Sequence, residues 1–508
     1  MRLGVDFGTT RTTVAAADRG NYPVVAFADD LDDVHEFIPS VVALDGDRPV
    51  FGFRAQELAR AGAPHVRSIK RLLADPEVSG ATTVRLGRRD LSLLGLVTGF
   101  LAYVGGCLRA SSSVSEIPEG EPLEAVVGIP AHAHSAQRFL TLEAFRAAGF
   151  SVLAMVNEPS AAGFEYTHRH AGTLTGRRGH VLVYDLGGGT FDASLVAVSG
   201  RAHEVLGSRG NNLLGGDDFD AILARCALRE AGVAEASLSE GAWEALLEEA
   251  RLAKESMSPQ SRVLVLDVGG RDVAVPVARF SEDAGMLVEA TLATMEPLLA
   301  RDRDGAGVLS PDVAGLYVVG GGSELPLVSR ALRARFGRRV HRSPHTAAST
   351  AIGLAIAADP DAGYTLSERL SRGLGVFRER ESGSRVSFDP VLGPDQRVST
   401  TSTVSVSRTY RAAHNIGWFR FVEYTATDDE GVPRGEVLPS GQVVMPLTPP
   451  LQDRVRAGGD IGGVEIVRTE DGPLVEELYS VDPHGIVTVQ IRDCSTGFSI
   501  RRSLTPSS

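Results

Sequence analysis

The sequence predicts a two-lobed α/β protein followed by an antiparallel β domain, and three observations lead to this fold class. Residues 3–18 and 181–198 share one order of parts, in which an apolar strand, a Gly/Thr turn and a second strand follow each other. Apolar residues at helical spacing separate the further strands. Beyond about residue 360 this spacing gives way to short alternating strands. The 508 residues accommodate two or three domains of ordinary size.

Charge and composition narrow the class of protein. The formal net charge of −13 argues against a non-specific nucleic-acid binder, whose surface should be basic. The three cysteines are far apart and form no CxxC, which excludes a disulfide scaffold or a structural zinc knuckle. We find no run of eighteen apolar residues and no signal-peptide layout, so we expect no membrane span and a cytoplasmic location.

The first strand-turn-strand segment, residues 3–18, ends its first strand at Asp6, directly before a turn that contains glycine. Gly8 allows the backbone of this turn to approach a ligand closely, so that amide groups can point at a phosphate. Thr9 and Thr10 add hydroxyls, and Asp6 can hold a magnesium ion, mainly through bound water. The turn is therefore a candidate phosphate and metal site.

The second segment, residues 181–198, offers the same chemistry from the other half of the molecule. Its candidate residues are Asp185, Gly187, Gly188, Gly189, Thr190 and Asp192. One such turn is weak evidence by itself. Two turns in matching positions predict a cleft in which a polyphosphate and its metal are clamped from both sides.

A third glycine cluster, Gly320, Gly321 and Gly322, follows the apolar strand LYVV. Ser323 is expected to cap the helix that follows, with Pro326 in its first turn. Helix amino termini favour anions, although a plain strand-to-helix turn is the alternative interpretation. The sequence contains two lysines, Lys70 and Lys254, and neither follows a glycine. A GxxxxGK[ST] phosphate loop is therefore absent from the sequence.

The order of the remaining elements follows from spacing. Residues 246–257 and 327–336 carry apolar residues at helical spacing and predict helices. Residues 359–372 are expected to form a connector, and 373–508 an antiparallel β domain whose last hairpin turns at DPHG.

These motifs resemble the 70-kDa heat-shock chaperones, and the resemblance runs nearly from end to end. The family's DLGTT hairpin is matched by residues 6–10, and its DLGGGTFD is matched identically by 185–192. Its NEPTAAA is matched by 157–162, its LGGEDFD by 214–220 and its GGSTRIP by 320–326. The last hairpin, VDPHGIVTVQIRDCSTG, looks like the family's substrate-binding β domain.

The resemblance implies an actin-like ATPase fold with duplicated ribonuclease H-like sheets, followed by an antiparallel β-sandwich domain. It places the nucleotide-binding domain at 1–358, with lobe I at about 1–170 and lobe II at about 171–358. An interdomain linker would occupy 359–372, and a substrate-binding-like domain 373–508.

The implied function is that of a slow ATPase and chaperone, active in protein folding and the stress response, that binds unfolded polypeptide segments. The implied cofactors are ATP or ADP and Mg²⁺, with K⁺ as a further candidate. The implied partners are unfolded or extended polypeptides, a J-domain co-chaperone and a nucleotide exchange factor, and neither nucleic acid nor a membrane.

Catalytic and metal roles carry over from the matched motifs. Lys70 falls where the family keeps the lysine that reaches the γ-phosphate, and Glu158 falls on the carboxylate that positions the attacking water. The implied catalytic residues are Lys70, Glu158, Asp185, Thr190 and Asp6, and the implied metal residues are Asp6, Asp185 and Asp192. Phosphoryl transfer to water needs this kind of positioning more than it needs a strong base.

Two further sets are implied in the same way. The nucleotide-contacting residues are Gly8, Thr9, Thr10, Gly187, Gly188, Gly189, Gly216, Asp217, Lys254, Glu255, Ser258, Gly320, Gly321, Gly322 and Glu324. Pro130 and Arg138 match the family's switch, which relays the nucleotide state to the partner domain.

Lysine usage supports a working site. Of 51 basic residues only two are lysines, Lys70 and Lys254. Both fall on positions that contact the nucleotide in the family. A compact ammonium is not interchangeable with a planar guanidinium where geometry is tight, so the survival of these two lysines favours a functional nucleotide site.

The sequence also departs from the family at the adenine-binding positions. Glu255 stands where the family has an arginine that stacks on adenine, and Arg251 stands where it has a glutamate. The ion pair is thus expected to persist with its members exchanged. Glu324 replaces the second stacking arginine, and no neighbouring residue is expected to offset it. Each lost cation–π contact costs about 0.5–2 kcal/mol, so we expect ATP to bind more weakly than in a typical relative.

The C-terminal part departs as well. The connector lacks the family's acidic, leucine-rich run. No long amphipathic helix follows the β domain, so we expect the helical lid to be missing and peptide to leave quickly. Phe419 and Phe421, on one face of a predicted strand, are candidates for the lining of a peptide groove. Ordinary core aromatics are the alternative interpretation.

Two other function classes stay open on this fold. A sugar-kinase-type phosphotransferase would need an aspartate base and polar sugar contacts, and would have no use for a terminal β domain. A non-catalytic, actin-like scaffold would not need Lys70 and Glu158. A nucleotide turnover assay without sugar, with and without unfolded peptide, separates the three.

Overall fold

The computed structural model describes residues 1–508 except 116, 119, 304, 395, 400–401 and 505–508. The chain divides into two compact units. Unit 1 comprises Met1–Ala74, Thr82–Ala133 and Leu142–Leu366, and unit 2 comprises Asp75–Ala81, His134–Thr141 and Ser367–Ser508. The candidate catalytic and nucleotide-binding residues therefore all belong to unit 1.

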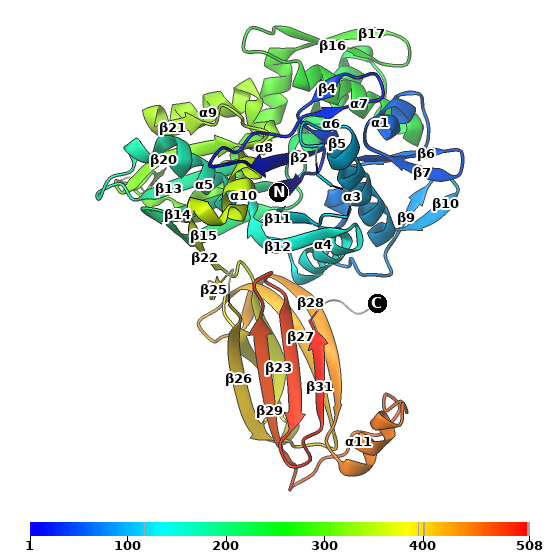
Figure 1. The fold of residues 1–508 in the computed structure, drawn as a ribbon, viewed down its shortest axis with the longest axis vertical. Helices are drawn as coiled ribbons and strands as arrows, with labels where there is room; N and C mark the ends of the chain where they lie inside the picture. Colours follow the sequence, from blue (N-terminus) through cyan, green and yellow to red (C-terminus); the bar gives the residue numbers. More distant parts are fainter. Residues whose placement is uncertain (116, 119, 304, 395, 400–401, 505–508) are drawn as a thin grey trace. The chain divides into compact units, whose positions relative to one another are not determined.

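The first sheet of unit 1 is built around the N-terminal hairpin (Figure 1). β1, Arg2–Phe7, pairs antiparallel with β2, Arg11–Ala17, and parallel with β11, Leu123–Ile129. β12, Phe150–Asn157, continues the sheet in parallel beyond β11, and β5, Ile38–Pro39, lies at the opposite edge. The apolar side chains of β1 are fully buried, which explains why this short segment forms a central strand.

The second sheet of unit 1 repeats this topology. β13, His180–Leu186, pairs antiparallel with β14, Phe191–Ser199, and parallel with β20, Val313–Val319. β21, Val340–Arg342, continues in parallel beyond β20, and β15, Ala202–Asn211, adds to β14. Each half thus places a hairpin beside two parallel strands, and the predicted duplicated, two-lobed α/β fold is confirmed.

Two largely buried helices connect the sheets. α10, Ser349–Ala358, contacts β1, β2 and β11, while α5, Glu158–His170, contacts β13 and β14, and the two helices pack on each other. A Cβ on Gly353 would lie 1.8 Å from the backbone of α5, and a Cβ on Gly4 would lie 2.2 Å from the backbone of α10. Because only glycine permits these approaches, the helices hold the two sheets at close range.

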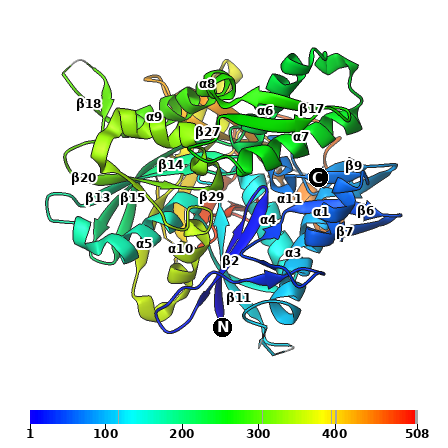
Figure 2. The same cartoon turned by 90° about the horizontal axis from the view of Figure 1, so that it is seen from above.

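The remaining elements of this part of the chain surround the two sheets. The helices are α1 (Gly52–Arg60), α2 (Ile69–Leu72), α3 (Leu93–Ala110), α4 (Ser135–Ala147), α6 (Gly216–Ala231), α7 (Glu240–Glu255), α8 (Val277–Met295) and α9 (Pro326–Phe336). The short strands are β3 (Phe27–Ala28), β4 (Val34–His35), β6 (Val41–Asp45), β7 (Arg48–Phe51), β8 (His65–Arg67), β9 (Thr83–Leu86), β10 (Arg89–Ser92), β16 (Val263–Asp267), β17 (Asp272–Pro276), β18 (Ala300–Arg301) and β19 (Gly307–Val308). Helix α9 covers the second predicted helical segment, and α7 covers the first as far as Glu255, two residues short of its predicted end. Figure 2 shows α6, α7 and α8 beside one another.

Helix α3 is long and apolar enough to cross a membrane, by length and composition only. The sequence pattern did not lead us to expect such a helix. Its Phe100 is fully buried, and the ring lies 5.7 Å from that of Phe7 in β1, measured between centroids. The packing against the first sheet makes α3 a core helix of unit 1.

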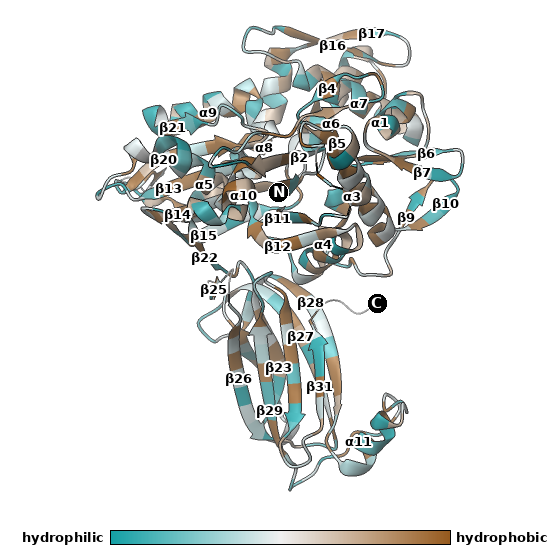
Figure 3. Ribbon diagram, viewed as in Figure 1, coloured by the Kyte–Doolittle hydropathy of each residue, from teal (hydrophilic) through white to brown (hydrophobic). Residues whose placement is uncertain are grey.

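Unit 2 contains two antiparallel sheets that share one apolar core. Their strand orders are β24-β23-β27-β28 and β26-β29-β30-β31. The bounds are β23 (Gly373–Arg380), β24 (Arg385–Leu392), β26 (Val404–Arg411), β27 (Ile416–Thr427), β28 (Pro433–Pro446), β29 (Leu474–Val481), β30 (Val487–Asp493) and β31 (Ser499–Ser503), with one helix, α11 (Pro449–Arg456). Polar and apolar residues alternate along these strands (Figure 3), as a sandwich requires.

The core of unit 2 also contains a cluster of charged and phenolic groups. The Arg378 guanidinium donates to both carboxylate oxygens of Glu477, over 3.0 and 2.7 Å, and to Asp389 over 2.6 Å. The hydroxyls of Tyr410 and Tyr479 donate to Glu477 as well. Glu477 is fully buried, and these partners compensate its desolvation.

The predicted connector, 359–372, contains an ordered strand. This strand is β22, Thr365–Arg369, whose first amide donates to the carbonyl oxygen of Arg201 over 3.0 Å. Its later residues pair antiparallel with β25, Arg397–Ser399. The end of unit 1 is thus tied to the edge of the second sheet.

Candidate nucleotide-binding site

The turns of the two hairpins face each other, and they lie so close together that a side chain at the glycine positions would clash with the opposite turn. A Cβ on Gly188 would lie 2.6 Å from Oγ1 of Thr10, and a Cβ on Gly189 would lie 2.7 Å from Cγ2 of Thr9. A Cβ on Gly8 would meet the backbone of its own turn at 2.2 Å. The two phosphate-binding turns predicted from the sequence therefore meet in the structure, with their backbones close together.

An ammonium and a carboxylate lie beside these turns. Lys70 is in α2 and Glu158 opens α5, and Nζ of the lysine donates to Oε1 of the glutamate over 2.5 Å. Both side chains are at least nine-tenths buried. Burial alone would lower the pKa of Lys70, but the carboxylates of Glu158 and Asp6 outweigh it and raise that pKa. Lys70 is thus held as a cation.

Three aspartates form a cluster of like charge next to this pair. Burial, reinforced by the charge of Glu158, raises the pKa of Asp6 to about 7 and that of Asp192 to about 8. The same causes raise the pKa of Asp185 well above its usual range. Carboxylates crowded in this way favour a bound cation, so the donor set fits Mg²⁺.

The cluster does not chelate a metal directly. Among the residues that the structure describes, no three His, Cys, Asp or Glu side chains converge closely enough to hold an ion. A magnesium ion at this place would therefore be held mainly through its waters, as Mg²⁺ usually is beside phosphates.

The third glycine cluster closes against the second turn. Gly320 has a φ of +83°, and a Cβ there would lie 2.4 Å from Oδ1 of Asp185. The predicted helix cap is wrong, because Ser323 donates its hydroxyl to the carbonyl of Val319 over 2.6 Å. Helix α9 starts at Pro326 without a side-chain cap. What the glycine cluster provides is a close approach of its backbone to Asp185 and the second turn.

The LGGDDFD segment buttresses the second turn from behind. The amide of Gly216 donates to the carbonyl of Gly187 over 3.0 Å, and the amide of Asp217 donates to that of Gly188 over 2.7 Å. Lys254 extends from α7, and its Nζ donates to the carbonyl of Gly216 over 2.8 Å. The second lysine of the chain thus lies beside the second turn.

Lys254 is also neutralised by a carboxylate. Its Nζ lies 2.7 Å from Oδ1 of Asp220, a residue of α6 that is 1% exposed. The same carboxylate takes an ion pair from Arg67 at 3.3 Å. These contacts fix the ammonium at the wall of the site.

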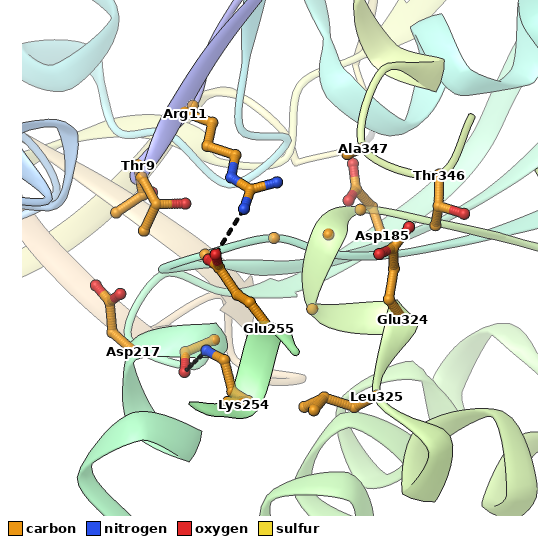
Figure 4. Close-up of a pocket in the computed structure, with 18 of the residues that line it drawn as sticks. Thr9, Arg11, Asp185, Asp217, Lys254, Glu255, Glu324, Leu325, Thr346 and Ala347 are labelled. Atoms are coloured by element: carbon orange, nitrogen blue, oxygen red, sulfur yellow. Dashed lines mark hydrogen bonds and ion pairs between the residues drawn. The ribbon is translucent and has the colours of Figure 1, made fainter. Parts of the chain in front are cut away.

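The expected exchange of charges at Glu255 is present. Glu255 pairs with Arg251, one helical turn earlier, at 3.1 Å and with Arg11 at 2.7 Å. Figure 4 shows Glu255 reaching from the end of α7 to Arg11, which comes from β2. The guanidinium of Arg11 also lies 4.3 Å from the ring centroid of Phe37. This ion pair therefore joins the two halves of unit 1.

The expectation that nothing offsets Glu324 is wrong. Arg342, in β21, lies 3.3 Å from Oε1 of Glu324. Arg330 and Arg333, one turn apart on α9, line the same region. Arg342 thus offsets the charge of Glu324, but it comes from a sequence position that no local pattern connects with Glu324.

Most of these groups border one cavity of about 790 Å³. Every predicted catalytic residue lines it. So does every predicted nucleotide-contacting residue except Gly189, while Asp192 lies behind the wall. Sequence reasoning missed several lining residues, which are Asp220, Arg330, Arg333, Arg342, Thr346 and Thr350. Two signals were available. Asp220 ends the matched LGGDDFD segment, and the pair on α9 has i, i+3 spacing just after the glycine cluster.

A second cavity, of about 1060 Å³, adjoins the first. Arg11, Arg251 and Glu255 line both cavities, so their ion pairs form part of the wall between them. None of the predicted catalytic residues lines the second cavity.

The predicted switch residues lie apart from the cavity. Pro130 follows β11, and its carbonyl accepts the amide of Ala133 over 3.0 Å. Arg138, on the part of α4 that belongs to unit 2, donates to the carbonyl of His484 over 3.3 Å. Neither position tests the predicted relay, which stays a prediction.

The predicted groove lining is wrong, because Phe419 and Phe421 belong to the core of unit 2. Their side chains are 7% and 1% exposed, and their rings stack with centroids 6.5 Å apart. Phe421 also packs edge-on against Tyr479 of the facing sheet at 6.0 Å. Both rings point inward, so neither lines an open groove.

Similar proteins are known for most of the chain. The family model described as Hsp70 protein matches residues 112–368. Chaperone protein HscA of Serratia proteamaculans (strain 568) is 34% identical over 394 residues, which cover 74% of this chain and 62% of that protein. Chaperone protein HscA homolog of Burkholderia pseudomallei (strain 668) is 35% identical over 380 residues, which cover 72% and 59%. The matched part spans about three fifths of the length of these curated relatives.

Proposed function

This chain belongs to the Hsp70 family, and from that premise we propose that it is an ATP-hydrolysing chaperone that binds unfolded polypeptide segments. One observation carries the proposal. The buried pair of Lys70 and Glu158 opens onto the same cavity as two opposed glycine turns. This is the set of groups that in-line transfer of a phosphoryl group to water requires.

Different residues of the chain have different roles in this reaction. The glycine turns hold the phosphates through their amides, and the Lys70 ammonium neutralises charge on the γ-phosphate. Glu158 orients the attacking water and accepts a hydrogen bond from it. Burial of both side chains excludes bulk water and keeps the reacting groups aligned. The step is hydrolysis, in which water attacks phosphorus and the ADP oxygen leaves.

Magnesium fits the three aspartates described above. Asp6, Asp185 and Asp192 would hold it through its waters, and the ion would supply charge neutralisation between the β- and γ-phosphates. Potassium is a further candidate ion for the same anionic wall. Turnover would be slow, as the family resemblance implies. ATP binding would be weak, because no arginine occupies the two positions that stack on adenine in the family.

The remaining assignments rest on family membership. The partners would be extended polypeptides, a J-domain co-chaperone and a nucleotide exchange factor, and the location would be the cytoplasm. Pro130 and Arg138 would relay the nucleotide state. We assign no residue to the peptide site, since the aromatic pair proposed from the sequence lies in the core.

Turnover of ATP by the full chain tests the proposal. We expect hydrolysis in Mg²⁺ without any sugar, and stimulation by an unfolded peptide. A requirement for sugar would favour the phosphotransferase, and binding without turnover would favour the scaffold. Peptide release measured with and without ATP then shows whether the two activities are coupled.

A pair of variants tests the mechanism. Glu158→Gln should lower turnover about a hundredfold or more while nucleotide affinity changes little, since general acid–base groups contribute on the order of 10²–10⁴. The control is Glu289→Gln, an exposed site on α8 that lines neither cavity. Persistent turnover in Glu158→Gln would remove the water-positioning role.

A further inference from the structure

The segment that carries Lys70, residues 67–71, is fastened to the opposite half of unit 1. Its helix α2 contacts α3, which packs on the first sheet. Helix α6 belongs to the apolar core of the second sheet. Between these helices, the hydroxyl of Ser68 donates to Oδ2 of Asp217, in the first turn of α6, over 2.5 Å. A side-chain hydrogen bond therefore joins the two halves directly beside the proposed catalytic lysine.

Asp217 extends this connection to the second glycine turn. Its amide donates to the carbonyl of Gly188 over 2.7 Å. Figure 4 shows the Asp217 carboxylate at the same side of the cavity as Thr9 of the first turn. Lys70 follows Ser68 by two residues, so two successive hydrogen bonds link the backbone near this lysine with the second turn. The place of the ammonium relative to that turn thus depends on Ser68.

The backbone of Ser68 is strained at the point where α2 begins. Its φ of +59° and ψ of +38° lie in the left-handed region, which residues with a Cβ rarely adopt. β8 ends at Arg67 and α2 begins at Ile69, so Ser68 is the only residue between them and sets the direction of the helix. Strain of this kind persists where contacts hold the residue in place. The bond to Asp217, made by a residue that is 8% exposed, is such a contact.

Two arginines beside Ser68 also hold the halves together, by charge. Arg67 lies 3.3 Å from Oδ2 of Asp220. Arg71 donates to Oδ1 of Asp218 over 3.1 Å. Both acidic partners belong to α6. These ion pairs remain when the Ser68 hydroxyl is removed, so the halves stay together while α2 loses the bond that fixes its start.

We propose that Ser68 is a positioning residue for hydrolysis, which acts by fixing Lys70 relative to the second glycine turn. The inference rests on the proposed function, because Lys70 must have a γ-phosphate to reach. Closure of the two halves brings Asp217 to Ser68, so the ammonium takes its place only when the cavity is closed around the nucleotide. Misplacement of a reacting group by about 1 Å costs up to about a hundredfold in rate.

Single-turnover hydrolysis of radiolabelled ATP by the full chain with Mg²⁺ tests the inference. Ser68→Ala should lower the rate about tenfold, since a hydrogen bond to a charged group is worth about that factor. Affinity for ADP, measured by calorimetry, should stay within about twofold, because ADP has no γ-phosphate for Lys70 to contact. The control is Ser237→Ala, which removes an exposed hydroxyl that donates to the carbonyl of Ala234 outside both cavities. This control should hydrolyse ATP like the wild type.

Two further variants separate positioning from general structural support. Ser68→Gly adopts the left-handed backbone without strain but lacks the hydroxyl, so its rate should fall as far as that of Ser68→Ala. In a Lys70→Gln background, Ser68→Ala should change the remaining rate by less than about twofold, because Ser68 acts through the lysine. A purely structural role would lower the rate by the same factor in both backgrounds.

The outcomes distinguish this inference from the proposed function. Absence of hydrolysis by the wild type overturns the proposed function, and the inference with it. Hydrolysis by the wild type with an undiminished rate in Ser68→Ala or Ser68→Gly overturns the positioning role alone. So does a loss of ADP affinity as large as the loss of rate, or an equal effect of Ser68→Ala with and without Lys70. If Ser68→Ala does not fold, Ser68→Gly carries the same tests.

Discussion

The ion pair between Arg11 and Glu255 should slow the release of a bound nucleotide. It joins β2 to the end of α7 across the cavity, so the two halves of unit 1 cannot separate there without breaking it. Arg11→Gln and Glu255→Gln each remove the attraction while keeping a polar side chain at the position. Both variants should therefore release nucleotide faster than the wild type.

The size of the effect follows from exposure. The side chains are 34% and 30% exposed, so solvent and salt screen the 2.7 Å contact, and such pairs contribute about 0.2–1 kcal/mol. Glu255 keeps Arg251 as a second partner when Arg11 is replaced, so no unpaired charge is left behind. Release should accelerate about 1.4- to fivefold, since 1.4 kcal/mol corresponds to tenfold.

Stopped-flow release of a fluorescent nucleotide measures this rate. The double variant should be no faster than Arg11→Gln, and added salt should accelerate the wild type towards the variants. Arg54→Gln, which breaks the exposed ion pair with Glu57 on α1, is the control and should leave release unchanged. Single-variant effects that multiply in the double variant would refute the reasoning, as would unchanged release.

Three further predictions concern pH, the glycine turns and the core of unit 2. Burial and neighbouring charge raise the pKa of Asp192 to about 8, so the folded protein binds more protons than the unfolded chain between about pH 4 and 8. Without Mg²⁺ its melting temperature should fall as pH rises through this range, and Asp192→Asn should flatten the fall; an equally steep fall in the variant contradicts this. Gly188→Ala should weaken nucleotide binding about tenfold or more by forcing the turns apart, whereas Gly106→Ala, in open space on α3, should not. Glu477→Gln should cost about 1–3 kcal/mol in urea unfolding, because it removes one of the two carboxylates that Arg378 contacts and leaves that guanidinium with Asp389 alone; a cost below about 0.5 kcal/mol would show that the pair contributes little.

The parts of the fold that a short stretch of sequence specifies could be predicted from the sequence. The two hairpins were recognisable because strand alternation and a glycine turn occupy fewer than twenty neighbouring residues. The glycines of both turns were predicted to let the backbone approach a ligand closely, and this stays a prediction. In the structure the turns also approach each other, since a Cβ on Gly188 would lie 2.6 Å from Oγ1 of Thr10. Lys70 and Lys254 were singled out by composition, and both line the cavity.

Two predictions were wrong for the same reason, which is that a local sequence pattern does not show which group a side chain contacts in the folded chain. A strand shows two faces, and its alternation does not say which face is covered, so Phe419 and Phe421 were placed at a groove although they pack inward. Ser323 was given to the helix that follows it, but the carbonyl of Val319, four residues earlier, provides the better acceptor.

The sequence by itself determined the duplicated hairpins, the glycine turns and the identity of the groups that would act on a phosphate, because each of these is encoded within a short stretch. Only the tertiary structure decided which charges meet. Arg11 and Glu255 are 244 residues apart, and Arg342 reaches from β21 to Glu324 in the turn before α9. Contacts of this kind depend on how separate elements pack, and no periodicity or motif within either element records them.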